Sequence, residues 1–329
     1  MLQTLKSVRH LAMATMKQTA TVSEFRMPVP WGEMRGRVWG PDHGRPVLCL
    51  HGWSDNSGSF NTLIPLLPAD WRCVAVDLPG HGFSSHRPAG VFYTFPDYIV
   101  DVRRVLEALQ WKRCSIIGHS MGGNIGGMIS ALYPDMVESL VLLDSYGFLP
   151  IDAKRMNRIM CRGIEEMLEY EKKVPDRKER IYTYEAAKER LKAANRFLSD
   201  KSVEILLERG IQMVDGGVVF TRDIRINLTN IVRTTLEQSL HLQSQINAKV
   251  LVLWANHGLQ KTFPQAEDLA GPLLKGWSGR NTSFETVEGD HHVHLNNPEI
   301  VAPIITDFLL SETSQHSGKA SGINQAPKL

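Results

Sequence analysis

The most constraining feature of the sequence is Gly118-His119-Ser120-Met121-Gly122, which separates two different hydrophobic patterns. Residues 114–118 form a short apolar run typical of a buried strand, and residues 122–133 have the composition of a helix. A chain that passes from strand to helix within so few residues must turn sharply, and glycines beside the turn relieve the crowding. The sequence therefore predicts a strand–turn–helix unit with Ser120 exposed at its tip.

A serine at such a tip has the surroundings of a catalytic nucleophile. The N-terminus of the following helix offers free N–H groups and a partial positive charge to a developing oxyanion. We therefore interpret Ser120 as a nucleophile and expect Met121 N–H to be one oxyanion donor. The second expected donor is Trp53 N–H, which comes soon after the apolar run 47–50. The alternative is a glycine-rich turn whose serine only caps the helix.

Apolar strands that alternate with helices indicate an α/β fold. The strands are nearly continuous in apolar residues, which is typical of a mostly parallel sheet that helices cover on both faces. A helix is expected between strands at 95–109, where apolar residues recur on one face. The expected strands are 34–39, 46–51, 73–77, 114–118, 140–143, 249–254 and 282–287, and the last expected helix is 298–310.

The pattern changes after Ser145, because residues 152–245 are charged and helix-like, apart from a weak hairpin signal at 216–219. A mainly helical insertion is therefore expected to interrupt the core, either as a lid over the active site or as a separately packed domain. The expected parts are a disordered or targeting extension (1–24), a first core part (25–145), the lid (146–245), a second core part (246–311) and a disordered tail (312–329).

A serine nucleophile needs a base, and the base needs an orienting acid. Three histidines compete for the role of base in Glu288-Gly289-Asp290-His291-His292-Val293-His294, a loop between the last expected strand and helix. The carboxylate that would orient the base is less obvious. Residues 255–259, which follow the strand 249–254, contain no acid, whereas Asp144 follows the strand 140–143.

Composition excludes several other classes of protein. The net charge is +2 with lysines and arginines scattered, so no nucleic-acid partner is expected. No apolar run reaches the length of a transmembrane helix, so no transmembrane segment is expected. Cys49, Cys73 and Cys114 lie in apolar runs, and with Cys161 they form no C-x-x-C pair, which indicates free thiols and no metal site. The turn at 77–84 is interpreted as structural.

The two ends of the chain contain targeting signals of different kinds. The first 23 residues are basic and free of acids, which suggests a mitochondrial presequence or a disordered extension. The last residues, Pro327-Lys328-Leu329, are close to the Ser-Lys-Leu address that a peroxisomal import receptor reads. A peroxisomal or cytoplasmic location is therefore expected, with the mitochondrion as the alternative.

Together these motifs resemble the α/β-hydrolase superfamily and, within it, the serine hydrolase-like proteins of vertebrates. The resemblance implies an α/β-hydrolase fold with a helical lid, and serine hydrolases of unsettled substrate that are associated with peroxisomes or perinuclear vesicles. The stretches that carry it are 28–32, 47–53, 63–68, 80–86, 118–123 and His291 with Val293-His294.

The resemblance also helps to choose the base and the acid. In related enzymes the histidine two residues after a glycine is the base, which selects His291. His292 is the next candidate, and His294 is expected to pack or to form a hydrogen bond locally. The usual acid follows the strand 249–254, where this sequence has His257 instead. Some haloalkane dehalogenases, which use an aspartate nucleophile, place their acid after the strand equivalent to 140–143. We therefore predict Asp144 as the acid.

These residues predict a serine hydrolase that acts by acyl transfer on small-molecule esters or thioesters, as a carboxylesterase or thioesterase does. A helical lid usually builds an apolar pocket, so a substrate with an apolar acyl group is expected. The reaction needs no metal or organic cofactor. The alternatives are a C–C bond hydrolase or lyase, and a catalytically weak protein that binds a ligand or partner.

Overall fold

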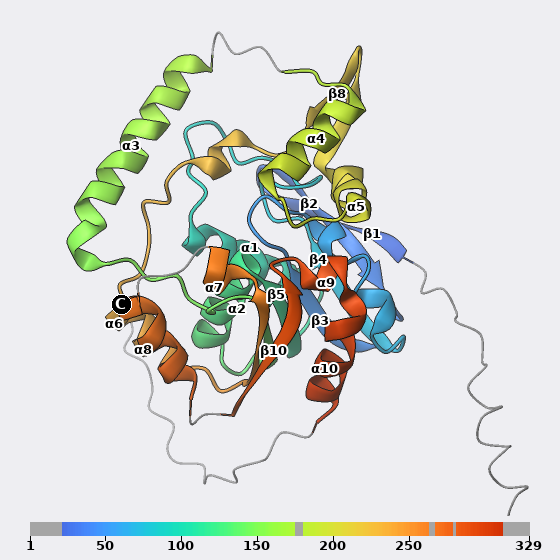
Figure 1. Ribbon diagram of the computed structural model, residues 1–329, viewed down its shortest axis with the longest axis vertical. Coiled ribbons are helices and arrows are strands. Elements are labelled where there is room, and N and C mark those ends of the chain that lie inside the picture. Colours follow the sequence, from blue (N-terminus) through green and yellow to red (C-terminus); the bar gives the residue numbers. More distant parts are fainter. Residues whose placement is uncertain (1–21, 175–179, 263–266, 279–280, 312–329) are drawn as a thin grey trace, which may run out of the picture.

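An eight-stranded sheet forms the centre of the protein, and its strands lie in the order β1-β2-β4-β3-β5-β6-β9-β10 (Figure 1). The structure is a computed structural model that describes residues 22–174, 180–262, 267–278 and 281–311. The pairs β1–β2 and β2–β4 are antiparallel, and all other neighbours are parallel. The strands are β1 (Val22–Val29), β2 (Gly32–Trp39), β3 (Arg45–Leu50), β4 (Trp71–Val76), β5 (Cys114–His119), β6 (Val137–Leu143), β9 (Lys249–His257) and β10 (Thr282–Asp290).

The first strand corrects one expectation from the sequence. β1 begins at Val22, so residues 22–24 belong to the core and not to a terminal extension. Glu24 pairs with Arg37 of β2 in an antiparallel ladder. The strand was missed because its exposed face is polar, and only Phe25 and Met27 turn inward. The rest of the proposed presequence and the Pro-Lys-Leu end lie outside the described residues.

Helices cover both faces of the sheet, because successive strand residues point to opposite sides and both sides are apolar. In β5, Ile116 packs into one hydrophobic cluster and Ile117 into the other, and both are fully buried. Burial of each such side chain contributes about 1.5–3 kcal/mol. The first cluster includes α1 (Phe95–Ala108), α2 (Met121–Leu132) and α8 (Glu267–Trp277), and the second includes η1 (Ser57–Phe60), η2 (Ile64–Leu66), α9 (Val293–Asn296) and α10 (Pro298–Leu310).

The chain between β6 and β9 forms a cap beside the sheet, in which α3 lies on one side and α4, α5 and β8 on the other (Figure 1). The expected hairpin is present as β7 paired with β8. The elements of this segment are η3 (Ala153–Arg155), α3 (Met156–Lys173), α4 (Tyr184–Ala194), α5 (Asp200–Gly210), β7 (Ile211–Val214), β8 (Gly217–Phe220), η4 (Ile224–Asn227) and α6 (Leu236–Ser244).

The last helix of this segment belongs to the core rather than to the cap. α6 contacts α2 and α8, which both pack on the sheet. The expected boundary at residue 245 therefore lies one helix too late. The sequence signal was misleading because α6 is polar on its exposed side, as the cap helices are.

A buried ion pair fastens the cap to the core. Arg209 of α5 donates two hydrogen bonds to Asp77 Oδ2, at 2.9 and 2.7 Å, and a third to Glu24 of β1 at 2.6 Å. The Asp77 carboxylate also accepts N–H bonds from Ser57 at 2.8 Å and Phe83 at 2.9 Å. The five groups hold the turn after β4 against the cap, which agrees with the structural role expected for residues 77–84.

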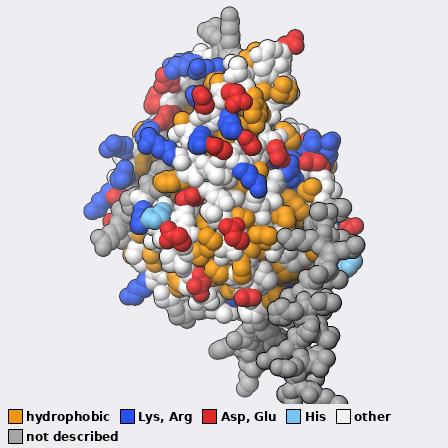
Figure 2. Space-filling model, turned by 45° about the vertical axis from the view of Figure 1, so that its right-hand side comes forward, with side chains coloured by type: hydrophobic (Ala, Val, Ile, Leu, Met, Phe, Trp, Pro, Cys, Tyr) orange, Lys and Arg blue, Asp and Glu red, His pale blue; other side chains and the backbone are white. Residues whose placement is uncertain are grey.

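The described residues also show the following general properties. No helix among them is long and apolar enough to cross a membrane. Cys49, Cys73, Cys114 and Cys161 are free thiols, and the first three are buried. On the face drawn in Figure 2, acidic and basic side chains are interspersed.

Candidate active site

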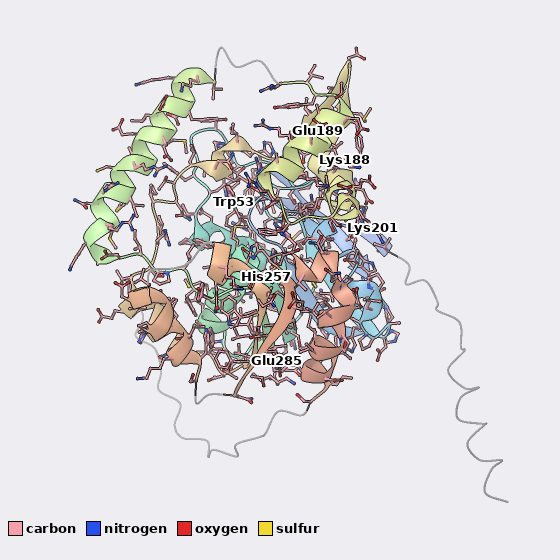
Figure 3. All side chains as sticks on the ribbon, viewed as in Figure 1. Trp53, Lys188, Glu189, Lys201, His257 and Glu285 are labelled. Atoms are coloured by element: carbon pink, nitrogen blue, oxygen red, sulfur yellow. The ribbon has the colours of Figure 1, made fainter. Side chains whose placement is uncertain are left out.

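The predicted site residues gather at one edge of the sheet. Parallel strands end at the same edge, and the residues in question follow four of them. Trp53 comes after β3, Ser120 after β5, Asp144 after β6 and His291 after β10. In Figure 3, Trp53 lies on the side of the sheet that faces the cap.

Ser120 occupies the sharp turn that the sequence predicts, with a φ of 51° and a ψ of −114°. A residue with a side chain rarely adopts this backbone conformation, which costs about 1–3 kcal/mol. Close packing explains the glycines on either side, because a Cβ at Gly118 would lie 2.5 Å from Gly122 O. A Cβ at Gly122 would lie 2.0 Å from Leu50 O. The turn is held further by a hydrogen bond from Ser120 N to Leu143 O at 3.1 Å.

Asp144 and His291 form a hydrogen bond, with 2.6 Å between His291 Nδ1 and Asp144 Oδ2. A carboxylate only accepts, so Nδ1 carries the hydrogen and Nε2 of the neutral ring keeps a lone pair. The Asp144 side chain is 1% exposed and that of His291 15%, so the acid is buried and the imidazole reaches the surface. This is the arrangement of an oriented general base.

The end of β9 and the residues that follow it support Asp144 instead of supplying an acid of their own. Ala255 N donates to Asp144 Oδ1 at 3.2 Å, and Leu259 N donates to Oδ2 at 2.6 Å. A Cβ at Gly258 would lie 2.2 Å from Asp144 Oδ2, so the loop approaches the carboxylate closely. His257, which is labelled in Figure 3, is exposed at the end of β9, and its Nε2 lies 3.5 Å from Glu288 Oε1.

The two predicted oxyanion donors lie on neighbouring elements. α2 begins at Met121, whose N–H has no acceptor within the helix. The first turn of α2 packs on the end of β3, just before Trp53. The Trp53 indole Nε1 donates to Ile226 O of η4 at 3.0 Å, which ties this loop to the cap. Among the described residues, Ser120 Oγ forms no hydrogen bond, so the structure joins His291 to Asp144 but does not join Ser120 to His291.

Three more histidines, His119, His292 and His294, lie close to His291 in the structure. His119 Nε2 donates to the carbonyl oxygen of His291 at 2.8 Å. Burial lowers the pKa of His119 to about 4, so its ring is neutral near pH 7. His294 packs on His119 with ring centroids 4.2 Å apart, and burial holds its pKa well below the usual range. His294 is therefore a buried residue that packs against its neighbours, as the sequence predicts.

His292, the alternative base, faces away from the Asp144 contact toward Asp55. His292 Nε2 lies 3.2 Å from Asp55 Oδ2. Burial opposes the charge on His292, but the Asp55 carboxylate outweighs that effect and raises the pKa of the ring. Burial alone would raise the pKa of Asp55, yet the positive charge and the hydrogen bond of His292 hold it well below its usual value.

Sequence reasoning missed Asp55 and the part that His119 plays in this cluster. A usable signal was present, because Asp55 follows Gly52 at the same sheet edge as the other site residues. His119 directly precedes Ser120, and nothing near it in the sequence points to a partner at residue 55. Each residue is distant in sequence from its partners, and no local pattern links them.

Comparison with known proteins shows which family the chain resembles. Residues 45–187 match the family model described as alpha/beta hydrolase fold. A serine hydrolase-like protein of Danio rerio is 60% identical over 329 residues, which is 100% of both chains. The human serine hydrolase-like protein 2 is 38% identical over 88% of this chain and 94% of its own.

Solved structures agree with the sequence relatives. A hypothetical protein of Pseudomonas aeruginosa PAO1 superposes with a TM-score of 0.78 at 30% identity, covering 88% of this chain and 99% of that chain. Fold, site and relatives point the same way, and the chain belongs to the serine hydrolase-like proteins, a family of hydrolases with the α/β-hydrolase fold.

Proposed function

We propose that this hydrolase cleaves esters or thioesters through a Ser120–His291–Asp144 triad and a covalent acyl-enzyme. The observation that carries the proposal is the 2.6 Å hydrogen bond between His291 Nδ1 and Asp144 Oδ2, at the same sheet edge as Ser120. The main reason to consider a catalytically weak binding protein was the lack of a carboxylate in residues 255–259. Asp144, which follows β6, is hydrogen-bonded to His291, so that reason no longer applies.

The proposed reaction has two halves. His291 Nε2 takes the proton of Ser120 as Oγ attacks the carbonyl carbon, and the tetrahedral oxyanion accepts hydrogen bonds from Trp53 N–H and Met121 N–H. The C–O or C–S bond then breaks, and the leaving group takes the proton from His291. In the second half, water gives a proton to His291 and attacks the acyl-enzyme, which releases the acid and restores Ser120.

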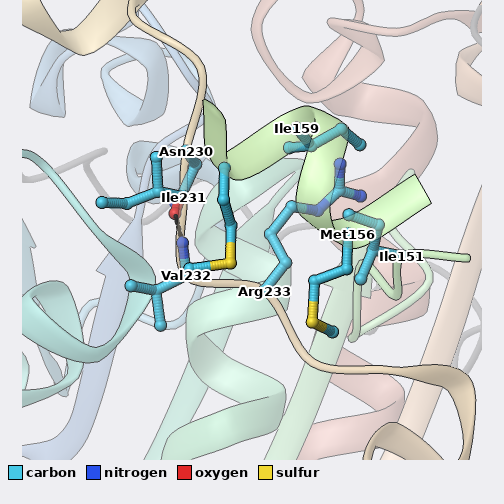
Figure 4. Close-up of a pocket in the computed structure, with 8 residues that line it drawn as sticks. Ile151, Met156, Ile159, Asn230, Ile231, Val232 and Arg233 are labelled. Carbon is cyan, nitrogen blue, oxygen red and sulfur yellow. Dashed lines mark hydrogen bonds between the residues drawn. The ribbon is translucent and has the colours of Figure 1, made fainter. Parts of the chain in front are cut away.

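An apolar hollow in the cap is the observation that favours a substrate with an apolar acyl group. The hollow has a volume of about 180 Å³ and lies between α3 and the segment that leads back to α6 (Figure 4). Its lining includes none of the predicted site residues, so the proposal needs the acyl chain to extend from Ser120 into the cap. Apolar side chains dominate its lining, which suits a hydrocarbon chain rather than a charged group. The lining residues are Ile151, Met156, Ile159, Met160, Asn230, Ile231, Val232 and Arg233.

A fluorophosphonate probe tests the nucleophile. The probe phosphonylates an activated serine with loss of fluoride, so the wild type is expected to become labelled and Ser120→Ala to stay unlabelled. Ser283→Ala, which changes an exposed serine of β10, is the matched control and should label fully. Folded wild-type protein that takes up no probe would contradict the proposal and leave a binding protein.

A series of p-nitrophenyl esters tests the acyl group, with acyl thioesters run in parallel. We expect kcat/KM to rise with acyl length in the wild type, since longer chains bury more apolar surface. Ile159→Trp would fill the hollow and reduce activity on long acyl chains more than on acetate. Ile164→Trp is the control on the same helix, because that side chain is 43% exposed and outside the lining. Equal losses at all lengths in Ile159→Trp would refute the assignment.

A further inference from the structure

A buried cluster of metal-ligating side chains lies behind the His291 loop. It consists of Asp55 after β3, His119 at the end of β5 and His292 after β10. One potential ligand atom from each residue lies within 4.8 Å of the other two, and all three side chains are buried. Three elements far apart in the sequence thus bring two imidazoles and one carboxylate to a single point.

One atom of this cluster lacks the partner that burial requires. His119 Nε2 donates to the His291 carbonyl at 2.8 Å, and a carbonyl only accepts, so Nε2 carries the hydrogen. In the neutral ring Nδ1 then has a lone pair, and this buried atom makes no hydrogen bond. It lies 3.5 Å from Asp55 Oδ2, which is also an acceptor. Two lone pairs that face each other out of water call for a positive centre between them.

Gly52 packs closely against the same two acceptor atoms. A Cβ at Gly52 would lie 2.8 Å from His119 Nδ1 and 3.1 Å from Asp55 Oδ2. Both distances are too short for a side chain, so a residue larger than glycine at position 52 would displace one of the two proposed ligands.

The spacing and type of the ligand atoms select the kind of ion. Bonds of about 2.0–2.2 Å in a tetrahedral site separate neighbouring ligand atoms by roughly 3.3–3.5 Å. Asp55 Oδ2 lies 3.2 Å from His292 Nε2 and 3.5 Å from His119 Nδ1. Two imidazoles with one carboxylate suit zinc and its neighbours, whereas calcium and magnesium prefer oxygen alone.

We propose that Asp55, His119 and His292 form a binding site for one divalent transition-metal ion of the Zn²⁺ type, separate from the Ser120 hydroxyl. The ion would replace the direct Asp55–His292 contact and give His119 Nδ1 a partner. Because His119 holds the His291 carbonyl and His292 is the next residue, the ion would stiffen the loop that carries His291.

Co²⁺ tests the site by its own spectrum, without reliance on hydrolysis. The full chain carrying Ser120→Ala is freed of metal with a chelator, which is then removed, and is incubated for hours with Co²⁺ alone because the ligands are buried. We expect visible absorption typical of four-coordinate Co²⁺, saturation at one equivalent, loss of the signal on adding Zn²⁺, and a higher unfolding temperature with either ion.

Variants separate this cluster from adventitious binding. Asp55→Asn keeps the shape but removes the charge, and should weaken Co²⁺ binding on the order of a hundredfold. His257→Gln removes the exposed His257–Glu288 pair and should bind as the wild type does. Absence of a one-equivalent signal, equal affinity in Asp55→Asn, or loss of binding in His257→Gln would each overturn the proposal. If Asp55→Asn does not fold, His119→Asn serves in its place with the same expectation.

Discussion

The Asp144 carboxylate accepts three hydrogen bonds at once, from Ala255 N, Leu259 N and His291 Nδ1. An asparagine there would present an NH₂ group to at least one of these donors. The imidazole would then turn or change tautomer, and Nε2 would lose the lone pair that takes the serine proton. We expect Asp144→Asn to lower kcat for ester hydrolysis by roughly 10²–10⁴ while the fold is kept.

His257→Gln is the control for this prediction, because His257 occupies the position where the acid of related enzymes usually lies. It should retain full kcat, since His257 contacts Glu288 and not His291. Full activity in Asp144→Asn, or an equal loss in His257→Gln, would show that the acid has been misassigned.

Backbone strain at Ser120 separates two substitutions that both remove the hydroxyl. At a φ of 51° a Cβ is crowded, at a cost of about 1–2 kcal/mol, whereas glycine is relaxed. Ser120→Gly should therefore be more stable than Ser120→Ala by about 1 kcal/mol in urea unfolding, although neither is labelled by the probe. An alanine variant as stable as the glycine variant would mean that the turn relaxes without strain.

At the scale of elements, Arg209 is the contact through which α5 holds the turn after β4. Both Arg209 and Asp77 are buried, so removal of the guanidinium leaves a carboxylate out of water without a cation. We expect Arg209→Ala to lower the free energy of unfolding by about 3–5 kcal/mol. Limited proteolysis should then cleave the cap before the core.

Lys192→Ala is the matched control for the cap, because its partner Asp200 is exposed and such pairs contribute little. It should leave both the urea midpoint and the proteolysis pattern unchanged. If Arg209→Ala unfolds with the wild-type midpoint, the cap is held by its apolar contacts alone.

At the scale of the whole molecule, buried neutral histidines make stability depend on pH. Burial lowers the pKa of His51, His81, His119 and His294 below the usual 6.5. Below that pH these histidines are protonated in the unfolded chain but stay neutral in the folded chain. The free energy of unfolding therefore falls as the pH falls. His292 acts in the opposite sense, because its raised pKa adds stability on the acidic side that is lost as the pH rises through its folded pKa.

Four histidines oppose one, so we expect the unfolding temperature, measured with EDTA present, to fall between about pH 7 and pH 5. His294→Leu removes one of the four from a site where neither ring nitrogen has a partner among the described residues. Its unfolding temperature should fall less over the same range. A midpoint that does not change with pH in the wild type would contradict the assignment.

Local patterns predicted most of the fold and the main site residues. The turn at Ser120, the apolar strands and the loop at His291 each depend on neighbours in sequence, and strand order then brings them together. Asp144 was predicted as the acid from its place after the strand 140–143, with support from the resemblance. Its two backbone donors, Ala255 and Leu259, depend on how the end of β9 and the residues after it fold. Asp55 and His119 could not be paired from sequence, since only the finished sheet makes them neighbours.

The positive φ angles at Ser120 and Asp144, 51° and 45°, have a consequence for the evolution of this family. Glycine adopts such angles without the crowding of a Cβ, so each of the two side chains is held at an energetic cost. We expect relatives that keep the chemistry to keep a side chain at both turns. Glycine at either turn would then mark a relative that retains only the scaffold.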